Sequence, residues 1–236
     1  MHKRLACIAI AAAVLIGNGR CLAQDWRSFA APAVLIGAGT FGLCSGWYSQ
    51  NVNLPVKDYM ADLRQGNYLH ADDYIQYAPV AASLLFSIAP KYRSGWQDRV
   101  VLAATGAAIS AAFVNGLKYT VCELRPDGSC ANSFPSGHTA TAFMGAELVR
   151  LEYGGWWGAA AYTLAAATGF LRMYNERHWS SDVLAGAGFG ILSARIAWWL
   201  LPWERRQLGK LSILPYFAAL PRTTTACSGF ALCYNF

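Results

Sequence analysis

The sequence predicts an all-α protein: a bundle of about five to six largely membrane-embedded helices with a short C-terminal tail. Of its 236 residues, 55% are hydrophobic and only 14% are charged, whereas an ordinary soluble domain has about 25% charged residues. Long apolar runs recur along the chain, as in small polytopic membrane proteins. The net charge of +6 comes from short, scattered basic groups. A nucleic-acid partner is therefore not expected.

Residues 1–23 have the pattern of a secretory signal peptide. A basic start, HKR, precedes an apolar core over residues 5–17, and the small-x-small sequence CLA stands just before Gln24. This order of basic, apolar and small residues is typical of a cleaved signal. The alternative interpretation is an uncleaved first membrane helix.

Apolar segments compatible with helices follow one another through the next part of the chain. They cover residues 29–46, 74–89, 100–117, 136–151, 156–171 and 181–201. Residues 52–70 are mixed in character and compatible with an interfacial helix. Several of the apolar segments are shorter than the roughly 20 residues that a full membrane span needs. Two interpretations of the short segments therefore stay open: tilted membrane spans, and helices buried in a bundle.

The C-terminal region changes character after Pro202, which ends the last long helix. Residues 203–236 begin with a basic exit, WERRQLGK, and continue as a tail with β-favouring residues around a Thr/Ser/Gly turn. This composition is compatible with a β-hairpin.

The cysteines allow two interpretations. In an exported protein, Cys122 with Cys130 and Cys227 with Cys233 could each close a short loop, which would leave Cys44 free. The alternative is that all are inert free thiols. No Cys/His cluster has the spacing of a metal site, so no metal is predicted.

Three polar stretches interrupt the helices: KYTVCELRP (residues 118–126), PSGH (135–138) and RMYNERHWSSD (172–182). Each lies where a predicted helix ends or begins. In an up-and-down bundle these connections fall at the same end of the molecule. We therefore expect their charged and imidazole side chains to converge there: Lys118, Arg125, His138, Arg172, His178 and Asp182.

The cationic and small residues of these stretches suit an oxyanion. Lys118, Arg125 and Arg172 offer three positive groups, and the arginine fork matches phosphate oxygens. Ser136 is a natural N-cap, and Gly137 lets the backbone approach a ligand closely. The N-terminus of the following helix then adds N–H groups and a positive dipole end. Together these features predict a phosphate-binding site.

The remaining residues suit nucleophilic and acid catalysis. His178 and Asp182 are four residues apart, so the carboxylate can fix the imidazole tautomer and leave the other nitrogen free to attack. His138 could protonate the departing oxygen. The three cations would supply the charge that Mg²⁺ supplies elsewhere, so no metal or cofactor is expected. Taken singly, each residue has an ordinary interpretation, such as an interfacial histidine or a charge that orients the chain in a membrane.

These stretches resemble the type 2 phosphatidic acid phosphatase superfamily, whose signature is K-x6-RP, PSGH and SR-x5-H-x3-D. The resemblance covers roughly residues 100–201, and Leu171 stands where the family most often has serine. It implies that His178 is the nucleophile, His138 the acid and Asp182 the orienting carboxylate. It also implies five phosphate ligands: Lys118, Arg125, Ser136, Gly137 and Arg172. Three loop neighbours either shape leaving-group access or are ordinary interface residues: Glu176, Arg177 and Trp179.

The resemblance implies a metal-independent phosphatase that acts on a membrane lipid through a phosphohistidine. The candidate lipids are lipid A, undecaprenyl diphosphate, phosphatidic acid and phosphatidylglycerol phosphate, with lipid A slightly favoured by the signal-like start. Haloperoxidases of the same superfamily are much larger chains. Two alternatives stay open: a periplasmic acid phosphatase for soluble substrates, and a non-catalytic phosphate-binding membrane protein. The oligomeric state is left open.

The domain plan that follows has a helical phosphatase domain over residues 24–202, with its motif core at 118–182, and a tail over 203–236. We expect a multi-pass protein of the bacterial inner membrane. Six basic residues outside the site should be cytoplasmic by the positive-inside rule: Lys91, Arg93, Arg99, Arg205, Arg206 and Lys210. This orientation places the site in the periplasm. A cleaved signal followed by three spans would reverse this orientation. Residues 29–46 are therefore expected not to cross, unless the N-terminal segment inserts differently.

Overall fold

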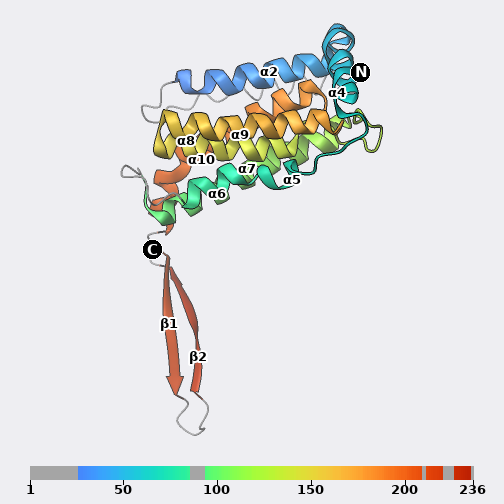
Figure 1. Ribbon diagram of the computed structural model, residues 1–236. Helices are drawn as coiled ribbons and strands as arrows, with labels where there is room; N and C mark the ends of the chain where they lie inside the picture. Colours follow the sequence, from blue (N-terminus) through green and yellow to red (C-terminus); the bar gives the residue numbers. More distant parts are fainter. Residues whose placement is uncertain (1–25, 86–93, 209–210, 220–225, 235–236) are drawn as a thin grey trace. The chain divides into compact units, whose positions relative to one another are not determined.

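The computed structural model describes residues 26–85, 94–208, 211–219 and 226–234 (Figure 1). The chain forms two compact units, Met1–Trp198 and Trp199–Phe236. The expected signal peptide lies outside the described residues. The helices of the described part are η1 (Trp26–Phe29), α2 (Ala30–Cys44), α3 (Gly46–Tyr48), η2 (Ser49–Asn53), α4 (Leu54–Arg64), α5 (Asp72–Ile75), α6 (Ala78–Leu85), α7 (Trp96–Val121), α8 (Gly137–Tyr153), α9 (Gly155–Tyr174) and α10 (Ser180–Leu208). The predicted all-α bundle is confirmed. The prediction that Pro202 ends the last long helix is wrong, because α10 continues past Pro202 to Leu208.

Helix α8 is the centre of the first unit and packs on α6, α7 and α9. The start of α8 lies beside the ends of α7 and α9 and beside the start of α10, so neighbouring helices run up and down as expected. The pairs that show this are Gly137 with Val114 of α7, Thr139 with Gly169 of α9, and Ser136 with Gly186 of α10. All three polar stretches therefore meet at one end of the bundle, which we call the site end.

Small residues allow α10 to approach α8 closely. A Cβ at Gly186 would collide with the carbonyl oxygen of Ser136, and one at Gly190 would collide with that of Ala140. Alanines fill much of the buried space between the helices, as Ala140 and Ala185 show. Close backbone packing through small residues is characteristic of helices in membranes. It seats the PSGH turn directly on the first turns of α10.

Glu147 ties three helices together in the interior of the bundle. Its side chain is fully buried and accepts hydrogen bonds from Arg150 Nε at 2.7 Å and from the Tyr162 hydroxyl at 2.6 Å. It also pairs with Arg195 of α10. A buried carboxylate is tolerable only when such partners satisfy it. This cluster is structural and lies well along α8 from the site end.

Within the described residues, two helices are long and apolar enough to cross a membrane, α7 and α10. A third candidate is α2 taken together with the helical stretch Gly46–Arg64, which bends away from it by 85°. At 15 residues, α2 alone is about 22 Å long, less than the ~30 Å of a bilayer core. Embedding of the shorter helices, and the failure of residues 29–46 to cross, stay predictions.

The tail forms an antiparallel hairpin of β1 (Leu211–Ala219) and β2 (Ala226–Tyr234). Cys227 and Cys233 lie on the same strand, six positions apart, or about 20 Å in an extended chain. A disulfide needs Cα atoms within about 7 Å, so the bridge suggested between them is wrong.

The other cysteines also differ in part from the predicted pairing. Cys122 and Cys130 are exposed free thiols and are not bonded to each other. Cys44, expected to be free, is disulfide-bonded.

Candidate active site

Main-chain hydrogen bonds join the three polar stretches pairwise. They run from Asp127 N to Glu176 O (3.2 Å), from Ser136 N to Asp182 O (3.0 Å) and from Ser133 N to Glu123 O (2.8 Å). Each bond links two of the stretches, or one stretch and a residue that flanks another, as Asp127 and Ser133 do. The convergence expected from helix parity is therefore confirmed.

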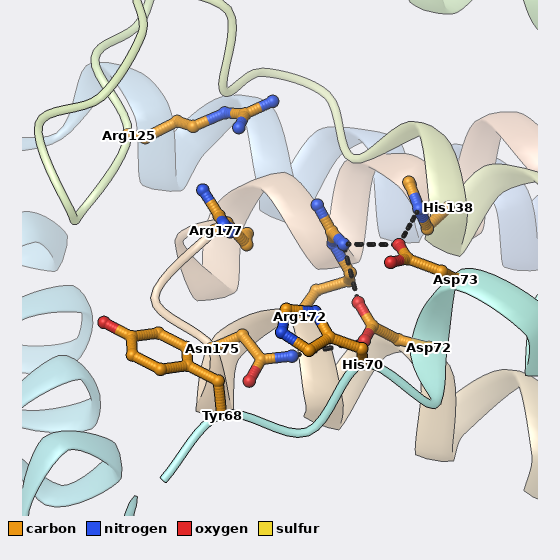
Figure 2. Close-up of a pocket in the computed structure, with 9 residues that line it drawn as sticks. All are labelled: Tyr68, His70, Asp72, Asp73, Arg125, His138, Arg172, Asn175 and Arg177. Carbon is orange, nitrogen blue, oxygen red and sulfur yellow. Dashed lines mark hydrogen bonds and ion pairs between the residues drawn. The ribbon is translucent and has the colours of Figure 1, made fainter. Parts of the chain in front are cut away.

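A cavity of about 270 Å³ opens at the site end (Figure 2). Its lining residues are Tyr68, His70, Asp72, Asp73, Arg125, His138, Arg172, Asn175 and Arg177. Three of these are predicted site residues: Arg125, His138 and Arg172. The other five predicted residues do not line it: Lys118, Ser136, Gly137, His178 and Asp182. The cavity also contains an acidic pair from α5 that the sequence analysis did not include.

His178 lies in the connection between α9 and α10 and is only 3% exposed. Its Nδ1 is 3.7 Å from Asp182 Oδ2, which is beyond hydrogen-bonding distance. The Ser133 hydroxyl stands next to both groups. It donates to Asp182 Oδ2 and lies 3.4 Å from His178 Nδ1. The predicted pair is thus adjacent, but a serine that the sequence analysis missed completes it.

The charge state of His178 follows from its surroundings. Burial, together with the positive charges of Arg172, Lys118 and Arg125, holds the pKa of His178 well below its usual value. The imidazole is therefore neutral near neutral pH. A neutral imidazole is the form that can act as a nucleophile.

His138 is in the first turn of α8, and its Nε2 lies 3.0 Å from Asp73 Oδ1. Burial and the charge of Arg172 lower the pKa of His138, while Asp73 acts in the opposite direction through a hydrogen bond and its charge. Asp73 thus favours the protonated form of His138 and partly offsets the lowering of its pKa by burial and Arg172.

Arg172 forms a buried ion pair with Asp72, with Nη1 2.6 Å from Oδ2. Asn175 Nδ2 donates to Asp72 Oδ1 at 3.2 Å and to the Leu69 carbonyl at 2.7 Å. Figure 2 shows Asp73 between Arg172 and His138, whereas Asp72 lies between Arg172 and Asn175. The sequence signal for this pair is two adjacent acidic residues just before an apolar segment.

The other predicted phosphate ligands are available to different degrees. Lys118 Nζ donates to the Asn132 carbonyl at 2.9 Å. Ser136 is the N-cap of α8 as predicted, but its hydroxyl bonds Thr139 Oγ1 at 2.9 Å and not a backbone N–H. A Cβ at Gly137 would make only an ordinary 3.5 Å contact with Val114. Packing within the protein therefore does not demand glycine at this position.

The three loop neighbours mainly hold the loops together. Glu176 pairs with Arg64 at 3.1 Å, and the Trp179 indole donates to the Leu124 carbonyl at 2.8 Å. Arg177 pairs with Asp127 at 3.1 Å and also lines the cavity. Arg177 alone of these three reaches the cavity.

Three ligand atoms of Asp72, Asp73 and His138 lie within 4.8 Å of one another, as in some metal sites. The Arg172 guanidinium already neutralises Asp72 and lies 3.7 Å from Asp73. A second cation there would face this fixed positive charge. We assign no metal to the group.

The helical bundle brings the histidines and cations of the three polar stretches to the site end. Residues 99–206 match the family model of the PAP2 superfamily. The chain is 46% identical over 134 residues to a lipid A 1-phosphatase of Porphyromonas gingivalis. That match covers 55% of this chain but only 30% of the relative. Among solved structures, the chain is similar to the crystal structure of Aquifex aeolicus LpxE, with 21% sequence identity and a TM-score of 0.45. This match covers 60% of this chain and 93% of that one.

Proposed function

We propose that the protein is a metal-independent phosphatase that removes phosphate from a membrane lipid through a phosphohistidine at His178. The main support for this proposal is electrostatic. Three cationic side chains from two of the polar stretches act on the buried, neutral imidazole of His178. Lys118 is repelled by Arg125 and Arg172, although Asp72 pairs with Arg172 and Asp182 attracts Lys118. A phosphate among them would relieve that repulsion.

In the first step, the lone pair of His178 Nε2 attacks phosphorus while the bond from phosphorus to the ester oxygen breaks. His138 gives its proton to that oxygen, so the lipid leaves as a neutral alcohol. Lys118, Arg125 and Arg172 hold the three remaining phosphoryl oxygens as charge moves onto them. Cationic side chains that neutralise this charge make a metal ion unnecessary.

In the second step, water attacks the phosphohistidine from the side of the departed alcohol. His138, now neutral, accepts the proton from this water. The phosphorus–nitrogen bond breaks, its electron pair returns to His178 Nε2, and inorganic phosphate leaves. The enzyme is then restored with both histidines in their starting states.

Lipid A is our first candidate substrate, because the curated relative from Porphyromonas gingivalis is named as a lipid A 1-phosphatase. The other candidates are undecaprenyl diphosphate, phosphatidic acid and phosphatidylglycerol phosphate. Exposed aromatic side chains near the site end support a membrane-surface location, for example Tyr74 at 80% and Tyr119 at 84% exposure. We place the protein in the bacterial inner membrane with this end in the periplasm.

The test is phosphate release by the full chain in detergent, with EDTA present. The panel holds the four lipids and a small soluble phosphate ester, and His178→Ala is compared with wild type. EDTA-resistant release from a lipid that His178→Ala abolishes is the expected result. Preference for the soluble ester would favour a periplasmic acid phosphatase. No release by a folded protein that still binds phosphate would favour a non-catalytic binder.

A further inference from the structure

Ser133 is fully buried between the two groups of the predicted nucleophilic pair. Its hydroxyl donates to Asp182 Oδ2 and lies 3.4 Å from His178 Nδ1. The direct distance between the imidazole and the carboxylate is 3.7 Å. The serine hydroxyl is therefore closer to Nδ1 than the carboxylate is, and the Ser133 main chain forms a further hydrogen bond with His178.

The carboxylate itself is held independently of the histidine. The backbone N–H of Trp179 donates to the same Asp182 Oδ2 at 2.9 Å. The Ser133 main chain is held as well, because its N–H donates to the Glu123 carbonyl at 2.8 Å. Both ends of the serine link are thus fixed by the main chain of neighbouring stretches.

A hydroxyl has one hydrogen to donate and two lone pairs that accept. Because Asp182 takes the hydrogen of Ser133, a lone pair faces His178 Nδ1. A lone pair attracts Nδ1 only when that nitrogen carries hydrogen. A neutral imidazole has a single N–H, so Nε2 is then left with its lone pair.

We propose that Ser133 is a positioning residue that connects Asp182 to His178 and fixes the tautomer in which Nε2 is free to attack phosphorus. The kinetic part of this proposal rests on the proposed function of the same site. The tautomer part does not, because it concerns the resting protein alone.

The first experiment reads the tautomer directly. The full chain in detergent is labelled with ¹⁵N-histidine, and the imidazole nitrogens are recorded at a pH where the ring is neutral. The chain has 4 histidines, and His178→Asn identifies the relevant signals. We expect hydrogen on Nδ1 in wild type, and mixed tautomers or hydrogen on Nε2 in Ser133→Ala. The same tautomer in both proteins would overturn the proposal.

The second experiment measures phosphate release from the preferred lipid of the panel. Ser133→Ala should lower kcat about ten- to a hundredfold, the loss found when a partner that orients a metal-binding imidazole is removed, with little change in KM. Ser133→Thr, which restores the hydroxyl, should recover much of the loss. Unchanged kcat in Ser133→Ala would contradict the proposal.

Matched variants separate this role from packing. Ser193→Ala removes another fully buried serine hydroxyl, one that only bonds the Phe189 carbonyl of its own helix, and should keep the wild-type tautomer and kcat. If Ser133→Ala does not fold, Ser133→Cys keeps the volume with a much weaker donor and should show the same changes. If wild type hydrolyses nothing, the proposed function fails and the tautomer experiment still decides the role of Ser133.

Discussion

Asp72 and Arg172, separated by 100 positions in the chain, form a buried ion pair with a 2.6 Å contact at the site end. The carboxylate occupies one side of the guanidinium that the motif would present to phosphate. Asp73, its neighbour, bonds His138 at 3.0 Å. Helix α5 thus places two negative charges among the groups expected to handle a phosphate monoester.

Removing Asp72 should destabilise the protein strongly. Its side chain is 2% exposed, and deleting one partner of a buried ion pair leaves the other charge uncompensated, at a cost of about 3–5 kcal/mol. Thermal unfolding of Asp72→Ala in detergent should therefore show a much lower midpoint than wild type. Asp73→Ala is the matched control, because that side chain is 51% exposed. Equal midpoints for the two variants would contradict a structural role for the Asp72 pair.

Neutralising Asp73 should tighten phosphate binding. Its carboxylate lies between His138 and Arg172, at 3.0 Å and 3.7 Å respectively, so it competes with an incoming anion for both. Product inhibition by inorganic phosphate measures this competition, and Asp73→Asn should lower the inhibition constant. A constant that rises would show that Asp73 supports the anion site and does not compete with it.

The pH dependence of kcat/KM should place the optimum on the acid side of 6.5, the usual histidine pKa. The nucleophile His178 must be neutral, so activity rises as pH increases through its strongly lowered pKa. The acid His138 must be protonated, so activity falls as pH increases through its own lowered pKa. Because Asp73 raises the pKa of His138, Asp73→Asn should move the alkaline limb to lower pH. A limb that stays in place would exclude His138 as the group responsible.

Lys118 should matter for the phosphoryl group and not for folding. Its Nζ has a backbone carbonyl as partner at 2.9 Å, and a charge-assisted hydrogen bond to phosphate contributes about 1.5–3 kcal/mol. Lys118→Ala should lower kcat/KM roughly ten- to a hundredfold with a near-normal unfolding midpoint. Lys57, whose Nζ lies 5.9 Å from the centre of the Trp179 ring, is the control lysine. Similar losses in Lys57→Ala and Lys118→Ala would argue against a specific phosphate contact.

Labelling of the exposed thiols can test the orientation of the site. Cys122 and Cys130 both lie in the connection between α7 and α8 at the site end. A membrane-impermeant maleimide added to intact spheroplasts should modify both when this end faces the periplasm. The double variant Cys122→Ser, Cys130→Ser provides the background. Modification only after the membrane is permeabilised would place the site in the cytoplasm.

The bundle and the convergence of the motifs could be predicted because they depend on local patterns and on helix parity. Apolar segments indicated the helices, and an up-and-down order fixes which connections share an end. The position of α5 could not be predicted, since it depends on how Leu69 and Asp72 pack against Asn175. Ser133 was missed for a related reason. Its role exists only once residues 123, 178 and 182 surround it.

The cysteine pairing failed because spacing along the chain was taken for proximity. Cys227 and Cys233 would be close across a turn, but Cys227 pairs with Ala218 and Cys233 with Ser212 of the opposite strand. Both cysteines therefore lie on one extended strand. The pairing of strands, and not the number of intervening residues, determines which side chains face each other.

The hydrogen bond from Ser136 N to Asp182 O joins the segment that carries His138 to the segment that carries His178. Because it involves only main-chain atoms, exchange of either side chain leaves it intact, proline at position 136 excepted. Most point mutations at the site end should therefore leave the spacing of the segments that carry His138 and His178 unchanged. A laboratory library that varies Tyr68, His70 and Asp73 could therefore change what the cavity admits and leave the spacing of the two histidine segments unchanged.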